Sequence, residues 1–246
     1  MINFFKNLAP VYLKKCARYY VQYVKQKNQN DAVVNDGPQY FLPAGYKSRL
    51  QPIFEDHNKN SILWQPDVYS LASMLAQATH ATHILDIGCG HGEKLVKFHP
   101  SYNVIGIDTK ENCTWCSEHY NFGEWLSMDL EQSLPELPVD AIGKTVLICS
   151  DVIEHIIDAH GFLNKLYRLL GMCSIGVIST PDRGLLYPFE QKGPPLFKKH
   201  VREWTAKEFK QLLDRAGMEA WVGETRASEE SWDMETIIAI VRHKNS

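Results

Sequence analysis

A glycine-rich turn between two acids is the stretch of this sequence whose residue types and spacing best suit ligand binding. It reads Asp86-Ile-Gly-Cys-Gly-His-Gly92, follows a short apolar run and precedes an amphipathic stretch. Glycines allow the backbone to leave a strand sharply and to approach a ligand at the next helix N-terminus. Asp108 ends the following apolar run, and an acid at the tip of a second strand can accept hydrogen bonds from both ribose hydroxyls. We therefore expect a ribose-containing ligand to be bound by Asp86, Gly88, Cys89, Gly90, Gly92 and Asp108.

The residue at position 93 distinguishes this loop from a dinucleotide-binding loop. A nicotinamide or flavin site would have a third glycine there, in the pattern G-x-G-x-x-G, but the residue is Glu93. The carboxylate of Asp86 at the strand end would repel a pyrophosphate. It would suit a cationic ligand, such as the amine or the sulfonium of S-adenosylmethionine. A nicotinamide-dependent oxidoreductase is therefore a disfavoured alternative.

The elements that must position these residues alternate between short apolar runs and amphipathic stretches. Buried apolar strands that alternate with helices predict an α/β fold with a mostly parallel, doubly wound sheet. Asp67 is a candidate N-cap, Thr205 with Glu208 forms a capping box, and Gly217 fits a helix stop. The expected strands are 83–87, 103–107, 145–149, 173–179, 219–222 and 236–241, and the expected helices are 68–77, 94–98, 161–170 and 206–216.

Composition and charge exclude several classes of protein. The net charge of −3 argues against a dedicated nucleic-acid binder, which usually carries a basic excess. No apolar run approaches the roughly 18 residues of a transmembrane helix. The six cysteines lack the spacing of a disulfide framework, so we expect reduced thiols in a cytoplasmic protein. Cys113, Cys116 and His119 form a C-x2-C-x2-H pattern without a second cysteine pair, which favours core packing on a helix over a zinc site.

We expect two parts in the chain: residues 1–65, an N-terminal arm with a linker and a lid, and residues 66–246, the catalytic domain. Residues 1–27 carry six lysines and arginines and no acid, and their tyrosines recur at helical spacing. We favour a helix that packs this stripe on the body or on a second copy of the chain in a homodimer. Contact with an anionic membrane is the alternative. Residues 28–43 are interpreted as a linker and residues 41–65 as the lid region.

Beyond the glycine loop, residues 64–242 resemble the class I S-adenosylmethionine-dependent methyltransferases, in the ubiquinone-biosynthesis-like (methyltransferase type 11/23) branch. The resemblance rests on the order of four further segments, which begin at Trp125, Cys149, Ile178 and His200. It implies a seven-stranded Rossmann-like sheet with S-adenosylmethionine as cofactor. The segments read WLSMDL, CSDVIEHI, ISTPDR and HVREWT. By this resemblance the adenine would meet Met128 and Asp129, the cofactor would also meet Ser150 and Asp151, and the acceptor would meet Glu154, Arg183 and Arg202.

Three residues after the fourth expected strand form a candidate metal site. The spacings of Asp151, Glu154 and His155 would put them on one face of a helix that begins at the strand tip. In some relatives the equivalent residues hold a divalent metal, but there the first acid is Glu. We therefore keep a metal as an open alternative that is not favoured over a polar pocket wall. His155 and His200 are the candidate general bases.

The expected reaction is methyl transfer from S-adenosylmethionine to a hydroxyl of a small molecule or of a sugar or glycan precursor. Methylation of an amine and a non-catalytic, partner-binding module are the alternatives. Nucleic acid is not expected as the acceptor, because the segment after the fourth strand has no Asn/Asp-Pro-Pro-aromatic element and no basic stripe is evident.

Overall fold

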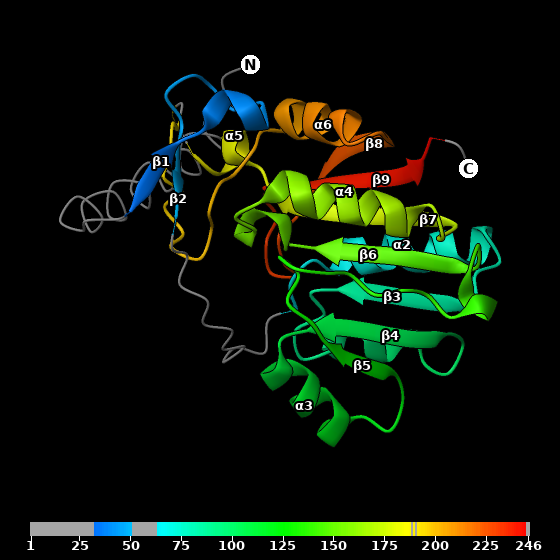
Figure 1. Ribbon diagram of the computed structural model, residues 1–246. Helices are drawn as coiled ribbons and strands as arrows, with labels where there is room; N and C mark the ends of the chain where they lie inside the picture. The colour runs from blue at the N-terminus through cyan, green and yellow to red at the C-terminus, as the bar shows by residue number, and fades with distance from the viewer. Residues whose placement is uncertain (1–31, 51–62, 188, 190, 245–246) are drawn as a thin grey trace, which may run out of the picture.

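Seven strands form one twisted sheet in the order β5-β4-β3-β6-β7-β9-β8 (Figure 1). The computed structural model describes residues 32–50, 63–187, 189 and 191–244. The first five strands in this order are parallel, and β9 runs antiparallel between β7 and β8. The predicted doubly wound α/β sheet of seven strands is confirmed. The strands are β3 (His83–Ile87), β4 (Asn103–Asp108), β5 (Glu124–Ser127), β6 (Thr145–Ser150), β7 (Ile175–Pro181), β8 (Met218–Thr225) and β9 (Thr236–His243).

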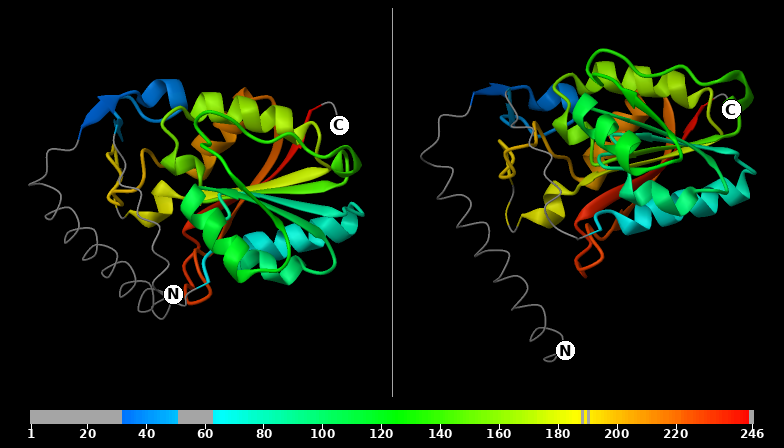
Figure 2. Two further views of the ribbon diagram at one scale, coloured as in Figure 1. Left: turned by 60° about the horizontal axis from the view of Figure 1, so that its bottom comes forward. Right: turned by 90° about the horizontal axis from the view of Figure 1, so that it is seen from below.

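Helices cover both faces of this sheet (Figure 2). α2 (Pro66–Ala78) and the 3₁₀-helix η2 (Glu93–Phe98) pack on one face, and α4 (Ala159–Leu170) and α6 (Ala206–Arg215) pack on the other. α3 (Lys110–His119) follows β4, and its Cys113 and Cys116 are buried as predicted. The shorter elements are η3 (Val139–Ala141), η4 (Ile153–His155) and α5 (Arg183–Leu186).

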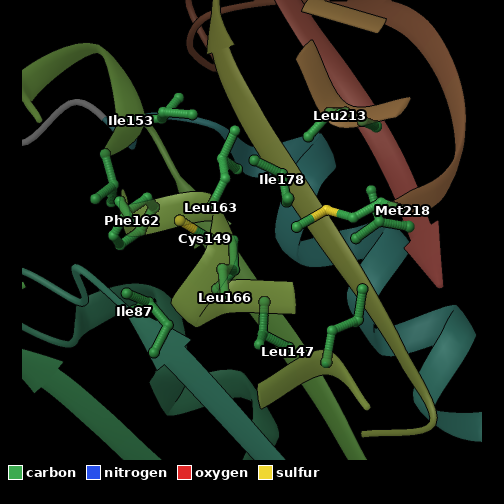
Figure 3. Packing of buried hydrophobic residues seen from close by; sticks show 14 of the residues in the cluster. Ile87, Leu147, Cys149, Ile153, Phe162, Leu163, Leu166, Ile178, Leu213 and Met218 are labelled. Carbon is green, nitrogen blue, oxygen red and sulfur yellow. The ribbon is translucent and has the colours of Figure 1, made fainter. Parts of the chain in front are cut away.

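The strand alternation decides which side chains reach which layer. In β3, Leu85 and Ile87 join the core beneath α4, so Ile84 and Asp86 must point toward α2. On the α4 side, Leu163 and Leu166 lie close to the β6 residues Leu147 and Cys149 (Figure 3). Asp86, the next-to-last residue of β3, is therefore enclosed by the α2 layer. This placement determines its partners in the site.

The helix ends differ in how well local sequence predicts them. α6 begins with the predicted capping box, in which Thr205 and Glu208 bind each other's backbone N–H. The prediction that Asp67 caps α2 is wrong. Gln65 occupies the cap position with a φ of 55°, and the Asp67 carboxylate instead accepts hydrogen bonds from Thr225 and Arg226. A partner 159 positions away has replaced the local bond that the sequence pattern indicates.

The described part of the predicted linker is packed against the body. β1 (Val33–Asn35) pairs with β2 (Lys47–Arg49), and η1 (Gly37–Tyr40) lies between them. Tyr40 is buried, and its carbonyl oxygen accepts a hydrogen bond from the indole N–H of Trp204. The described residues 32–43 of the predicted linker are therefore packed, and together with residues 44–50 they form a layer that is joined to the body.

Arg202 fastens this N-terminal layer to the body. Its guanidinium is 2% exposed and donates to the Asp36 carboxylate at 3.0 Å, to Ser48 Oγ, and to the carbonyl oxygens of Ile156 and Ile157. It also stacks on the Tyr40 ring at 3.9 Å from the centroid. One buried cation thus joins β1, β2 and η1 to the chain that follows η4.

Two expectations fall wholly or partly beyond the described ranges. The basic helix of residues 1–27 lies outside the described residues, and so do residues 51–62 of the predicted lid. Within the described part of the chain, no helix is long and apolar enough to cross a membrane.

Candidate functional site

Asp86 is the most deeply enclosed acid of the glycine-loop region. Its side chain is 0% exposed, and Oδ2 accepts a hydrogen bond of 2.8 Å from the Tyr69 hydroxyl of α2. Oδ1 is buried and has no hydrogen-bond partner among the described residues. Burial raises the pKa of Asp86 to about 7, against the opposing effects of the Lys94 charge and the Tyr69 hydrogen bond. An unpartnered buried acceptor at the tip of β3 suits a cationic or hydrogen-bond-donating ligand.

The glycine loop has the backbone conformation that its sequence predicts. Gly88, Gly90 and Gly92 have φ values of 79°, 54° and 68°, which side chains rarely allow. At Gly88 there is also no room, because a Cβ would stand 2.3 Å from Cγ2 of Val152. The N–H groups of Gly88 and Cys89 donate to the Ile107 carbonyl oxygen, so the loop is held against the end of β4.

Gly88→Ala is expected to lower the free energy of unfolding by about 2–4 kcal/mol, because the new Cβ adds a clash to the strain of a positive φ. Gly143→Ala is the matched control, since its φ is 72° and a Cβ there meets nothing within 4 Å. Urea denaturation of both variants separates the clash from the strain. Equal losses at the two positions would contradict the tight packing of Gly88 on Val152.

Asp108 joins β4 to the glycine loop. Oδ2 accepts a hydrogen bond of 2.8 Å from the Gly90 N–H, and Oδ1 accepts one of 2.8 Å from the Asn112 side chain at the start of α3. The structure therefore places this acid beside the loop, as its position at the second strand tip predicts. Its contact with ribose hydroxyls remains a prediction.

The two residues predicted to meet the adenine follow β5. The Met128 N–H donates to the Asp108 carbonyl oxygen, which places Met128 next to the predicted ribose site. Asp129 is exposed, and its Oδ1 accepts a hydrogen bond from the Glu131 N–H. Both residues follow the end of β5, next to the end of β4, and their adenine contacts are likewise predicted.

At the end of β6, Ser150 and Asp151 are bound to the neighbouring strand. The Ser150 and Ser179 hydroxyls lie 2.9 Å apart, and Ser179 donates to Asp151 Oδ1 at 3.1 Å. Asp151 Oδ2 accepts a hydrogen bond of 2.7 Å from the Gln65 side chain. Burial raises the pKa of Asp151, although Lys94, Gln65 and Ser179 oppose this. Its φ of 54° turns the chain sharply out of the strand.

The prediction of one α-helical face for Asp151, Glu154 and His155 is wrong. The segment is the single 3₁₀ turn η4, and the α-helix begins only at Ala159, where the Asp158 side chain caps it. The left-handed backbone of Asp151 starts the turn outside any helix, so its carboxylate points to Gln65 and Ser179 while Glu154 turns inward.

Glu154 and His155 instead come together with His200. One potential ligand atom from each of the three lies within 4.8 Å of the other two. Glu154 is 0% exposed, and its Oε2 accepts from the Thr180 hydroxyl. Its Oε1 is buried and has no hydrogen-bond partner in the part of the chain that the structure describes. Burial raises the pKa of Glu154 well above its usual value, and the neighbouring Asp151 charge raises it further.

Hydrogen bonds fix the tautomers of both histidines. His155 Nδ1 lies 2.9 Å from the Lys199 carbonyl oxygen, and His200 Nδ1 lies 2.5 Å from Glu203 Oε1. Because a carbonyl and a carboxylate oxygen accept, each Nδ1 carries a proton, and in the neutral form of each ring Nε2 then has the lone pair. His155 Nε2 lies 3.9 Å from Glu154 Oε1. The cluster therefore gathers acceptor atoms, which is the chemistry of a divalent-metal site or of a general base.

Glu203 is a functional candidate that the sequence motifs did not single out. It is 0% exposed, and its second oxygen, Oε2, accepts a hydrogen bond of 2.7 Å from Tyr187. It thereby fixes the orientation of His200, as a carboxylate does in His–carboxylate pairs. The i, i+3 spacing of His200 and Glu203 was the available signal.

The two arginines predicted to meet the acceptor are bound within the protein. Arg183 makes a bidentate pair with Glu208 at 2.6 Å and donates to the carbonyl oxygens of Gln191 and Glu203. Arg202 holds the N-terminal layer, as described above. Both arginines bind backbone carbonyl oxygens next to the cluster, Arg183 that of Glu203 and Arg202 that of Ile156. Their contact with an acceptor stays a prediction.

A scan of family models matches residues 39–221 to a methyltransferase domain. This match covers most of the chain, including the glycine loop, Asp108 and the cluster. The chain belongs to this methyltransferase family. S-adenosylmethionine is therefore its cofactor, and the nicotinamide-dependent alternative is not supported.

Among curated relatives, a probable S-adenosylmethionine-dependent methyltransferase of Mycolicibacterium smegmatis is 30% identical over 148 residues, covering 59% of this chain and 55% of the relative. The mitochondrial ubiquinone biosynthesis O-methyltransferase of Bos taurus is 35% identical over 95 residues, covering 35% of this chain and 25% of that protein. The methyltransferase thus spans about half the length, or less, of these relatives.

Solved structures share the fold at low identity. The plantazolicin methyltransferase BpumL in complex with SAH superposes with a TM-score of 0.51 at 20% identity, covering 73% of this chain and 83% of that one. The methyltransferase domain of bacterial CtHen1-C gives 0.55 at 16% identity, covering 73% and 97%. These likenesses establish the Rossmann-like architecture of the methyltransferase.

The residues present fit the cofactor. The loop glycines leave no side chain between the backbone and a ligand, and the unpartnered Asp86 Oδ1 lies at the strand tip beside them. Asp108 is at the next tip, where a ribose would be bound. When bound, S-adenosylmethionine supplies an activated methyl group on a sulfonium. The residues around the glycine loop and Asp108 would hold and align that cofactor.

Proposed function

We propose that the chain transfers a methyl group from S-adenosylmethionine to a hydroxyl oxygen of a small molecule or saccharide. The observation that carries this proposal is the convergence of Glu154, His155 and His200, which offer three potential ligand atoms within 4.8 Å of one another. A hydroxyl must lose its proton when it attacks a methyl group. These atoms could accept that proton, or they could bind a cation that makes the hydroxyl more acidic. The name of the bovine relative, an O-methyltransferase, supports a hydroxyl as the acceptor group.

Glu154, His155 and His200 are also the residues that would hold a divalent cation. Two imidazoles and one carboxylate are a common donor set for such an ion, and the buried Glu154 Oε1 has no other partner. The cation would supply Lewis acidity that lowers the pKa of an acceptor hydroxyl. Without a cation, His200, oriented by Glu203, would instead accept the acceptor's proton at Nε2. This donor set differs from the predicted one, because His200 takes the place of Asp151.

Calorimetric titration with Mn²⁺ after treatment with a chelator tests the donor set. We expect one ion per chain in the wild-type protein and roughly 10- to 100-fold weaker binding in Glu154→Gln, which keeps the size of the side chain but weakens its ligand atom. Glu219→Gln is the control, since Glu219 is exposed and pairs with Arg242 on β9. Titration with S-adenosylhomocysteine should give the same affinity in both variants.

Transfer of radiolabelled methyl groups from S-adenosylmethionine to phenols, catechols and sugars, with amines of matched shape in parallel, tests the acceptor. Label on hydroxyl acceptors that falls strongly in His200→Asn supports the proposal. Label only on the amines would show that the cluster serves nitrogen methylation. If Mn²⁺ does not bind and methyl transfer continues in the presence of a chelator, the reaction uses no metal. His200, oriented by Glu203, would then be the general base.

A further inference from the structure

Lys94 places an ammonium group at the opening of the cofactor crevice. It lies in η2, two residues after the last glycine of the loop, and its side chain is partly exposed. Its Nζ lies 4.7 Å from the centroid of the Tyr69 ring, and the hydroxyl of that ring donates to Asp86. The cation is therefore fixed near the tip of β3, on the α2 side of the sheet.

This ammonium has no ion pair in the part of the chain that the structure describes. Its one specific contact there is with the Tyr69 ring, and no carboxylate oxygen lies within 4.0 Å of Nζ. The next lysine along the same element, Lys97, instead donates to the Ser70 hydroxyl on the outer surface. The two side chains thus differ in direction and in partner, although they belong to one 3₁₀-helix.

Lys94 also affects the two acids that border the crevice. Burial is the main influence on the pKa of Asp86 and of Asp151, and it raises both. In each case the Lys94 charge is the largest influence that lowers the pKa. One ammonium is therefore within electrostatic range of the tips of both β3 and β6.

The direction of the cofactor follows from the strand order. The adenine site expected at Met128 and Asp129 belongs to β5, and the ribose site expected at Asp108 belongs to β4. Because the order continues β4-β3-β6, the rest of the cofactor must extend over β3 toward β6. Its methionine part, which carries an amine and a carboxylate, then comes to the tip of β3. There, among the residues that the structure describes, Asp86 Oδ1 has no hydrogen-bond partner and the Lys94 ammonium has no ion pair.

We propose that the ammonium of Lys94 binds the α-carboxylate of the methionine part of S-adenosylmethionine. Lys94 thereby selects a cofactor with a complete amino-acid group. The inference rests on S-adenosylmethionine as the cofactor and not on the acceptor or the metal proposed above. An acid at this position of η2 would repel that carboxylate, whereas a neutral residue would leave its charge without a partner.

Binding of two ligands by calorimetry tests this assignment without any assay of activity. One ligand is S-adenosylhomocysteine, and the other is its decarboxylated analogue, which keeps the amine and lacks the carboxylate. We expect the wild-type protein to prefer S-adenosylhomocysteine by about 10- to 100-fold, the range of a charge-assisted hydrogen bond. Lys94→Met should bind both ligands with similar affinity, Lys94→Arg should retain the preference, and Lys97→Met should behave as the wild type.

The decarboxylated analogue is also a folding control for Lys94→Met, because its binding should be unchanged. If Lys94→Met fails to fold, Lys94→Gln provides the second neutral variant, with the same loss of preference expected. An equal loss of affinity for both ligands would overturn the proposal, since Lys94 would then support the pocket without contacting the carboxylate. A preference that survives in the neutral variants, or that is absent from the wild type, would overturn it as well.

Discussion

Replacing Arg202 by alanine is expected to lower the free energy of unfolding by about 3–5 kcal/mol, because it leaves the buried Asp36 carboxylate without its cation. The same change removes donors to the Ile156 and Ile157 carbonyl oxygens and the stacking on Tyr40. The segment 32–50 would then lose one of its buried attachments to the body and keep those made by Arg49. Urea denaturation measures the loss, and limited proteolysis shows whether this segment is released first.

Two controls make the Arg202 result specific. Arg242→Ala removes an exposed pair with Glu219, in which both side chains are more than 40% exposed, and should change stability by less than about 1 kcal/mol. Arg202→Lys keeps the charge but loses the planar fork, so an intermediate loss is expected. A loss near that of Arg242→Ala would show that Arg202 does not fasten the N-terminal layer.

Asp86→Asn is expected to make the unliganded protein more stable than the wild type at pH 8, although the two should be similar near pH 3. The wild-type carboxyl has a pKa of about 7 when folded and 3.8 as its reference value. Below both values it is protonated in both states. Between them the unfolded chain releases the proton while the folded chain keeps it, so rising pH destabilises the fold. Asparagine does not titrate and avoids this loss.

The difference between wild type and Asp86→Asn should therefore grow as the pH rises from about 4 to 7 and then level off. At 1.36 kcal/mol per pKa unit it would reach the order of 4 kcal/mol. Urea denaturation at several pH values gives the profile. A pH-independent difference would show that Asp86 is ionised in the folded protein throughout this range.

The sheet could be predicted from sequence because its central strands are buried on both faces. Such strands are continuous apolar runs, and the run 83–87 matches β3 in full. The glycine loop was also predictable, since positive φ values at Gly88, Gly90 and Gly92 are a local requirement. These features depend on residues that are neighbours in the chain.

The errors arose where distant partners decide the structure. Asp67 binds Arg226 instead of capping its own helix, and Asp151 turns the chain before any helix can form. The cluster includes His200, which lies 45 positions after His155 and is brought close when the Val201 N–H donates to the Glu154 carbonyl oxygen. No periodicity in the sequence encodes that bond. The sequence motifs identified Glu154, His155 and His200 as candidates. They did not predict that the three side chains lie together.

The attachment of residues 32–50 to the far end of the chain has a consequence for biosynthesis. Asp36 is 166 positions from Arg202, and the three carbonyl oxygens that Arg49 binds lie 146 to 151 positions further along. A ribosome releases the early segment long before its partners exist. Until residues 195–202 have been synthesised, this segment cannot pack. Its apolar side chains that are buried in the folded protein then stay exposed, namely Tyr40, Leu42 and Tyr46. Closure of such distant contacts is slow, so chaperones have the longest opportunity to bind at this segment.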